Sequence, residues 1–355
     1  MRILILTQKI DKSDDVLGFM HGWVLEFAKN FEKVTAVCLQ KGEHDLPANV
    51  KVLSLGKPAQ DWSASGGKKL LQRLKAFINF YKYIWQERNN YDAVFVHMNP
   101  EYMALGGWLW KLVSKKTSLW YNHPSGGPLV RFSAIFADRI FFTSIFAYAR
   151  RFNKSKIMPA GIDTDIFRVD DNGRRYNNSL LSLGRVSPIK RVDLMIGLAK
   201  QLDKHNIDFR FDIYGGAASR DEAYYKQVRD DAKELETKGK ITFFPGISNL
   251  DTARVYNKYN VFINATPSGS LDKTIMEAMA CGCLVLVSNK SFVGQIPDSL
   301  IFEEDNVEDL YLRLNYLLYL HDEARDHYTS LLIKYVNETH SLIKLIQELK
   351  SALDN

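Results

Sequence analysis

The sequence predicts an α/β protein with two doubly wound parallel sheets. Three observations support this fold class. The chain has 355 residues, which suits about two domains. Short apolar strands alternate with helical stretches, and this alternation starts again after Leu180. Parallel strands joined by helices form sheets covered on both faces. We therefore expect two Rossmann-like domains that face each other across a central cleft.

Each half of the chain contributes its own set of expected elements. Strands are expected first at 3–7, 34–39, 50–55, 93–97 and 118–121, and then at 180–183, 209–214, 241–244, 261–264 and 284–287. Helices in the second half are expected near 189–204, 221–238, 250–258 and 272–281. The polar segment 170–178 separates the two sets. Ligands of such sheets bind at the carboxyl ends of the strands.

The amino-acid composition and the cysteine content are typical of a globular protein of the cytoplasm. Hydrophobic residues make up 46% of the chain and charged residues 25%, as in soluble globular proteins. Three cysteines cannot form a disulfide framework, and Cys281 and Cys283 lack the nearby His or Cys of a metal site. The N-terminus is expected to form a strand rather than a secretory leader, and no apolar run reaches transmembrane length. We expect a cytoplasmic protein.

Basic residues concentrate in the first half. Residues 1–155 hold 22 Lys and Arg against 12 Asp and Glu, a net charge of +10, whereas the rest carries −4. This asymmetry predicts an anionic partner, which could be nucleic acid, a phospholipid surface or a phosphorylated acceptor. The segment 66–85 interleaves apolar and aromatic residues with Lys68, Lys69, Arg73, Lys75 and Lys82. The pattern is typical of a solvated helix face or of a helix at an anionic membrane surface. No recognised nucleic-acid module accompanies it, so nucleic acid is not expected.

Glu277 is the single carboxylate among the apolar residues of the segment 275–280, just before an apolar run that is expected to form a strand. Because an unpaired buried carboxylate is costly, Glu277 should have a partner. The preceding loop, 267–270, would deliver backbone amides to a helix N-terminus, where anions bind. Amides for a phosphate and a carboxylate for paired hydroxyls together indicate a nucleotide-sugar pocket. The alternative is a structural helix in which Glu277 bonds a backbone group or an arginine.

Three further groups of residues follow expected strands. Arg185 and Lys190 lie between the strand at 180–183 and the next helix, where they can neutralise a diphosphate without a metal. His123 lies on a glycine-rich loop after the strand at 118–121, where its ring can bond a sugar hydroxyl. Gly18 ends the loop after the first strand and would let a phosphate approach the backbone. Each signal alone is also compatible with an incidental residue.

Three motifs in the correct order resemble the retaining glycosyltransferases of family four. They are P-A-G-I-D-T-D-I-F at 159–167, G-R-V-S-P-I-K-R at 184–191 and E-A-M-A-C-G at 277–282. The resemblance implies a GT-B fold. It implies an acceptor-side domain at 1–165, a domain that binds the nucleotide-sugar donor at 166–335, and a closing helix within 336–355 that packs back toward the first domain.

The resemblance also implies roles for single residues. Arg185 and Lys190 would hold the donor diphosphate, Glu277 would accept hydrogen bonds from the ribose hydroxyls, and His123 would approach the donor sugar. The remaining implied donor contacts are Gly18, Gly215, Gly269, Ser270, Asp272, Lys273 and Thr274. The implied transfer retains the configuration at the anomeric carbon and uses no metal or other cofactor. The donor would be of the UDP or GDP type.

One position departs from the family pattern. Family members usually carry a second glutamate eight positions before the Glu277 equivalent, and Gly269 stands there. Asp272 is the nearby carboxylate, and it could replace the missing side chain or could cap the helix. Otherwise loop amides hold the donor, or catalysis is weakened.

Two classes of function remain open. The first is an enzyme that transfers a sugar to a glycan or lipid-linked acceptor, either free in the cytoplasm or peripheral on the inner face of the cell membrane. The second is a degenerate transferase that binds nucleotide as a scaffold in a glycan-assembly complex, a reading that Gly269 favours. A nucleotide-sugar epimerase shares the expected fold but lacks support from the motifs. A dinucleotide oxidoreductase is disfavoured because no G-x-G-x-x-G follows the first strand.

Overall fold

The computed structural model describes residues 1–57, 67–170 and 175–354, without the side chains of residues 67–69. It divides into two compact units: Met1–Gly161 together with Leu342–Asn355, and Ile162–Ser341. Within the described residues, each unit has one sheet whose strand pairings are all parallel. Two parallel α/β units confirm the fold class that the sequence predicts.

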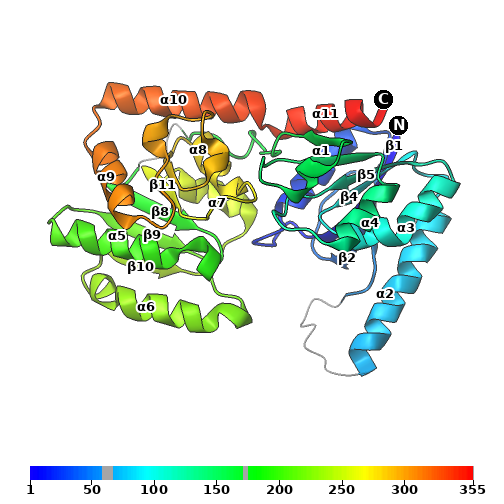
Figure 1. Ribbon diagram of the computed structural model, residues 1–355, viewed down its shortest axis with the longest axis horizontal. Helices are drawn as coiled ribbons and strands as arrows, with labels where there is room; N and C mark the ends of the chain where they lie inside the picture. The colour runs from blue at the N-terminus through cyan, green and yellow to red at the C-terminus, as the bar shows by residue number, and fades with distance from the viewer. Residues whose placement is uncertain (58–66, 171–174, 355) are drawn as a thin grey trace. The chain divides into compact units, whose positions relative to one another are not determined.

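The first unit contains a sheet of seven strands in the order β3-β2-β1-β4-β5-β6-β7 (Figure 1). Its strands are β1 (Arg2–Ile10), β2 (Lys33–Lys41), β3 (Val50–Ser54), β4 (Ala93–His97), β5 (Lys116–Trp120), β6 (Arg139–Phe142) and β7 (Ser155–Ile157). Its helices are α1 (Phe19–Asn30), α2 (Gly67–Gln86), α3 (Pro100–Leu112), α4 (Pro128–Phe136), α11 (Leu342–Asp354) and the short 3-10 helix η1 (Tyr148–Arg151). The sequence analysis missed β6 and β7, because these short strands begin with polar residues and do not show as apolar runs.

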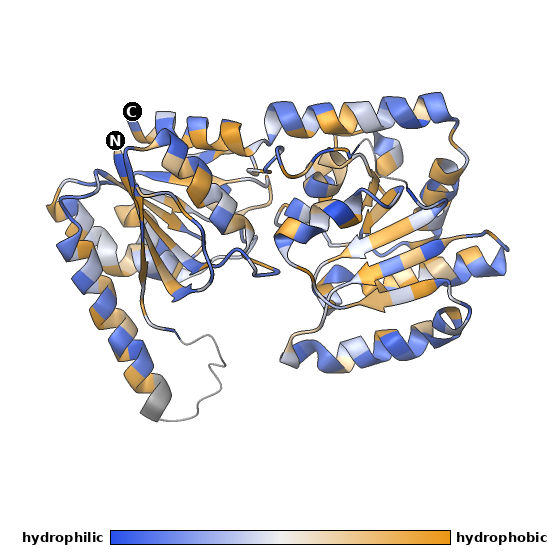
Figure 2. Cartoon of the chain, turned by 180° about the vertical axis from the view of Figure 1, so that it is seen from behind, coloured by the Kyte–Doolittle hydropathy of each residue, from blue (hydrophilic) through white to orange (hydrophobic). Residues whose placement is uncertain are grey.

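Alternate side chains of β1 explain how this sheet is covered on both faces. Ile3 and Ile5 belong to a core with residues of α1 and α11, whereas Leu4 and Leu6 belong to a core with residues of α2, α3 and α4. This follows from the two-residue period of a strand. Figure 2 shows the strands mostly in orange, as expected for sheets buried on both faces.

Helix α11 comes from the end of the chain and packs in the first unit beside α1. Gly161, the last residue of the unit's long segment, accepts a hydrogen bond from the Trp23 indole at 3.0 Å. Its φ is +72°, and a Cβ added there would lie 2.4 Å from Leu345 of α11. Glycine is therefore required where α1 and α11 meet.

The second unit contains a sheet of five strands in the order β10-β9-β8-β11-β12. Its strands are β8 (Ser179–Leu183), β9 (Arg210–Tyr214), β10 (Ile241–Phe244), β11 (Val261–Asn264) and β12 (Leu284–Val287). Its helices are α5 (Val192–Lys204), α6 (Glu222–Thr237), α7 (Asn249–Tyr256), α8 (Lys273–Ala280), α9 (Val307–Leu318) and α10 (Asp322–Thr339), with 3-10 helices η2 (Pro188–Lys190), η3 (Ser219–Asp221), η4 (Lys290–Phe292) and η5 (Asp298–Leu300). In the described part of the chain, no helix is both long enough and apolar enough to span a membrane.

Candidate functional site

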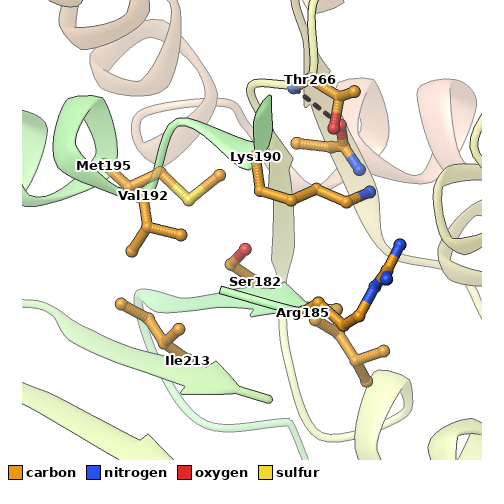
Figure 3. Close-up of a pocket in the computed structure, with 10 residues that line it drawn as sticks. Ser182, Arg185, Lys190, Val192, Met195, Ile213 and Thr266 are labelled. Atoms are coloured by element: carbon orange, nitrogen blue, oxygen red, sulfur yellow. Dashed lines mark hydrogen bonds between the residues drawn. The ribbon is translucent and has the colours of Figure 1, made fainter. Parts of the chain in front are cut away.

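A pocket lies at the carboxyl ends of β8, β9 and β11 in the second unit (Figure 3). The space between its lining atoms, open solvent included, is about 260 Å³. Its lining residues are Ser182, Leu183, Gly184, Arg185, Lys190, Val192, Met195, Ile213, Asn264 and Thr266. This is the edge at which parallel α/β sheets bind ligands, and it contains two of the predicted site residues.

Two glycines, Gly184 and Gly215, meet where β8 and β9 end beside the pocket. The backbone N–H of Gly184 donates to Tyr214 O, and that of Gly215 donates to Phe244 O, each at 3.0 Å. Both glycines have a φ of +141°, and a Cβ added to Gly215 would lie 1.9 Å from the carbonyl oxygen of Gly184. Only glycine fits this contact. The predicted site residue Gly215 therefore fixes the turn that carries Arg185, the next residue after Gly184.

The two basic side chains of the pocket have different surroundings. Arg185 is exposed, and among the residues that the structure describes its side chain has no hydrogen-bonded or ion-paired partner. Lys190 ends η2 and forms an ion pair with Asp272. Figure 3 shows both side chains extending toward the same side of the pocket. A fixed ammonium and an unpaired guanidinium can together bind a diphosphate.

Asp272 is the N-cap of α8, which was one of its two expected roles. Its Oδ1 accepts the Thr274 amide at 3.3 Å and the Thr274 hydroxyl at 2.9 Å, and its Oδ2 accepts the Asn264 amide at 2.9 Å as well as Lys190. Burial raises the pKa of Asp272, but Lys190 and these hydrogen bonds outweigh burial and lower it to about 2. Both carboxylate oxygens thus already have partners inside the protein.

Glu277 is buried on α8, as the sequence predicts, and it is not without protein partners. Its Oε1 accepts the Asn249 side-chain amide at 3.2 Å, and its Oε2 accepts the Tyr256 hydroxyl at 3.3 Å. These partners are neither the backbone group nor the arginine of the structural alternative. Burial raises the pKa of Glu277, and the positive charge of Lys273, one helical turn earlier, offsets this only in part.

The loop at 267–270 differs from the expected row of amides for an anionic ligand. The Ser268 amide donates to Glu304 Oε1 at 2.8 Å, and the Ser270 carbonyl accepts the Asn289 side-chain amide at 3.1 Å. The Thr274 amide is also taken, by Asp272. Carboxylates of the same unit therefore occupy the Ser268 amide, which was expected to bind an anion, and the amide of Thr274, an implied donor contact.

Gly18 and His123 belong to the first unit, whereas the other predicted site residues belong to the second. Gly18 precedes α1, and its amide donates to Asp14 O at 3.2 Å. His123 is exposed on the loop between β5 and α4, with its Nδ1 2.8 Å from the Ser125 hydroxyl.

Sequence reasoning missed several polar residues of the site. They are Asn249, Tyr256, Asn264, Thr266 and Glu304. Asn264 was detectable, because it ends a predicted strand and the carboxyl ends of parallel strands form the binding edge. The others depend on packing between elements, which the sequence pattern does not record.

Residues 165–330 match the family of glycosyl transferases group 1. The D-inositol 3-phosphate glycosyltransferase of Mycobacterium ulcerans (strain Agy99) is 26% identical over 149 residues, which cover 40% of this chain and 31% of that protein. Among solved structures, Alr3699/HepE of Anabaena in complex with UDP has a TM-score of 0.77 at 14% identity, with 100% of both chains covered. Sucrose-phosphate synthase of Thermosynechococcus elongatus has a TM-score of 0.77 at 15% identity, with 99% of this chain and 98% of that chain covered.

The likeness in sequence spans about a third of the length of the mycobacterial relative, whereas the likeness in structure spans nearly the whole chain. The candidate pocket, Asp272 and Glu277 all lie within the matched residues. Residues 165–330, slightly less than half of the chain, thus match the model of glycosyl transferases group 1, and the chain has the GT-B fold of two parallel-sheet α/β domains.

Proposed function

We propose that this protein is a retaining glycosyltransferase. It moves a sugar from a nucleoside diphosphate sugar of the UDP or GDP type to a glycan or lipid-linked acceptor at the cytoplasmic face of the membrane. The observation that carries the proposal is the pairing of Arg185 and Lys190 at the carboxyl edge of the second sheet, inside the segment that matches glycosyl transferases group 1. One of the structural relatives is described in complex with UDP.

The donor diphosphate would bind between Arg185 and Lys190. The unpaired fork of Arg185 can engage two phosphate oxygens. The ion pair with Asp272 holds Lys190 in place beside it, so that a second positive charge is positioned before the donor arrives. These two cations would offset the negative charge that develops on the departing diphosphate, and the reaction would need no divalent cation.

Glu277 would bind the ribose of the donor. Asn249 and Tyr256 donate to it through uncharged groups at 3.2 and 3.3 Å, which are long for bonds to a carboxylate. Two adjacent ribose hydroxyls could add the stronger bonds that an ionised carboxylate prefers. With Asp272 occupied and Gly269 lacking a side chain, neither residue is assigned to the donor sugar.

The transfer step exchanges one bond at the anomeric carbon for another. The bond from that carbon to the diphosphate oxygen breaks, and a bond to the acceptor oxygen forms on the same face. The acceptor's hydroxyl proton passes to the departing diphosphate. His123, on the exposed loop of the first unit, is assigned to the donor sugar through the family resemblance.

Helix α2 supports the membrane-proximal part of the proposal. It exposes the apolar side chains of Leu70, Leu71, Leu74, Phe77, Ile78 and Trp85. It also exposes Arg73, Lys75 and Lys82, whereas Lys68 and Lys69 lie outside the described side chains. Figure 2 shows the coloured part of this helix striped in blue and orange. Interleaved apolar and cationic side chains are the pattern of helices that bind anionic membrane surfaces.

The competing function is a nucleotide-binding scaffold without turnover, and Gly269 is the residue that favours it. A screen of UDP-sugars and GDP-sugars would separate the two, with thermal stabilisation and slow donor hydrolysis both measured. If the protein is an enzyme, one of the nucleotide sugars should raise its melting temperature and should be hydrolysed slowly. A chelator should not change the rate of that hydrolysis. Stabilisation without hydrolysis would favour the scaffold, and strict dependence on added magnesium or manganese would contradict metal independence.

A further inference from the structure

A second group of basic side chains lies in the first unit, around Tyr148 of η1, and the proposed donor site does not use it. Tyr148 is a buried residue, and its hydroxyl accepts the Arg131 Nε–H at 2.8 Å. The guanidinium carbon of Arg151 lies 3.7 Å from the centre of the Tyr148 ring. Arg131 comes from the N-terminal end of α4 and Arg151 from η1, so two separate elements bring two arginines to one tyrosine.

This cluster is joined to the loop that carries His123. The Tyr148 amide donates to the His123 carbonyl at 3.0 Å. A Cβ added to Gly126 would lie 2.4 Å from the Tyr148 ring, so the loop packs directly on that ring. The loop follows β5 and η1 follows β6, and these strands are neighbours in the sheet. The cluster therefore lies at the carboxyl edge of the first sheet, beside the residue assigned to the donor sugar.

The two arginines lack an acidic partner. Within the described ranges, neither Arg131 nor Arg151 forms an ion pair with a carboxylate. Other arginines of the chain do form such pairs, namely Arg2, Arg191, Arg210, Arg220, Arg229 and Arg313. The hydrogen bond from Arg131 and the charges of both arginines lower the pKa of Tyr148, as expected where uncompensated positive charge is concentrated. Arg131 and Arg151 are both exposed residues, and each guanidinium offers the planar fork that suits a phosphate.

We propose that Arg131 and Arg151, positioned by Tyr148, bind a phosphate group of the acceptor. This inference rests on the proposed function, because it assigns the acceptor class for the same transfer. Arg131 is followed on α4 by Phe132 and Ile135, which are both exposed. The ligand is a phosphate ester, either the headgroup of a lipid in a membrane or a soluble phosphorylated molecule.

Titration of the full chain with inorganic phosphate tests the subsite. The titration uses an Arg185→Ala background, which removes a donor-side phosphate contact. We expect Arg131→Gln and Arg151→Gln each to weaken phosphate binding roughly tenfold, because each removes a charge-assisted contact. Arg150→Gln is the matched control, since the Arg150 guanidinium donates to the Ile145 carbonyl at 3.3 Å and, among the described residues, forms no hydrogen bond or cation–π contact with Tyr148. The control should bind phosphate as the background protein does.

Equal phosphate affinity in the Arg131, Arg151 and Arg150 variants would overturn the subsite. Stabilisation by a nucleotide sugar is measured separately, so loss of the subsite and failure of the proposed function give different results.

A second titration distinguishes the source of the phosphate. Phosphatidylcholine vesicles that contain phosphatidic acid are compared with soluble dihexanoyl phosphatidic acid. Binding that depends on Arg131 and is stronger for the vesicles assigns a lipid headgroup, whereas equal binding assigns a soluble phosphate ester.

Discussion

At the scale of single residues, Asp272 has two structural roles in the second unit. It caps α8 through Thr274, and it holds Lys190 beside the pocket. Asn caps helices about as well as Asp. Asp272→Asn should therefore keep the cap while it removes the ion pair with Lys190 and the oxygen that accepts the Asn264 amide. Because the pKa of Asp272 is lowered from 3.8 to about 2, we expect the substitution to cost about 2 kcal/mol of unfolding free energy at pH 7.

The pH dependence of this cost gives the check. A carboxyl group with a lowered pKa stabilises the folded state above its ordinary value of 3.8, and that contribution is lost as pH falls through about 2. Urea unfolding of both proteins between pH 7 and pH 3 should therefore show curves that converge toward the acid end. A constant difference across this range would mean that the ion pair is not its cause.

Glu277 makes a second prediction at the residue scale. Burial raises the pKa of Glu277 from its ordinary value of 4.5. The folded state therefore holds the proton more tightly than the unfolded state does, and the unfolding free energy decreases as pH rises through the raised pKa. Glu277→Gln mimics the neutral form. We expect this variant to fold and to gain stability relative to the natural protein as pH rises from 5 to 8, as followed by thermal unfolding.

The same variant should bind nucleoside diphosphate more weakly, because an amide accepts hydrogen bonds from ribose hydroxyls less strongly than a carboxylate does. Calorimetric titration measures that loss. If Glu277→Gln binds the nucleotide as tightly as the natural protein does, Glu277 does not bind the ribose. That result would not affect the prediction about the pH dependence of stability.

At the scale of elements, the junction of β8 and β9 depends on Gly215. A methyl group there would collide with the Gly184 carbonyl and would hold a φ of +141° that side chains rarely adopt. We expect Gly215→Ala to destabilise the protein by roughly 1–3 kcal/mol or more and to displace the turn that carries Arg185. Gly216→Ala is the matched control, since a Cβ there meets nothing within 4 Å. Similar melting temperatures for the two variants would contradict this account of the junction.

Helix α2 carries the prediction about membranes. Reversal of charge at Arg73, Lys75 and Lys82 should reduce co-sedimentation with anionic vesicles, because each basic residue near such a surface contributes about 1 kcal/mol, screened by salt. Reversal at the exposed Lys200 and Lys204 of α5 in the second unit is the control. Docking through this helix would be ruled out if the protein bound neutral vesicles as strongly as anionic ones. It would also be ruled out if the α2 variant bound anionic vesicles as strongly as the natural protein does.

At the scale of the whole molecule, the sequence predicts the fold well because its signals are repeated. Ten of the strands show as apolar runs between helical stretches, and strands β4, β10, β11 and β12 have the expected bounds. Strands β6 and β7 did not show, since they are short and begin with polar residues. The pairing order within each sheet was not predicted, because it arises from contacts between distant segments.

The candidate site was predictable only in part. Arg185 and Lys190 reach one pocket because both follow β8 along the chain. The occupation of the Ser268 amide by Glu304 was not predictable, because 36 residues separate them and the contact depends on packing of the second unit. The same holds for the contacts of Glu277 with Asn249 and Tyr256 on another helix.

The central claim is that a nucleoside diphosphate binds at Arg185 in the second unit. Calorimetric titration of UDP and GDP into the natural protein and into Arg185→Ala tests it most directly. The exposed Arg220 of η3, paired with its neighbour Asp221, provides the control Arg220→Ala. We predict that one of the two nucleotides binds and that Arg185→Ala weakens it roughly 30-fold or more, with melting temperature unchanged and the control unaffected. Failure of both nucleotides to bind the natural protein, or equal affinity in Arg185→Ala, would contradict the claim.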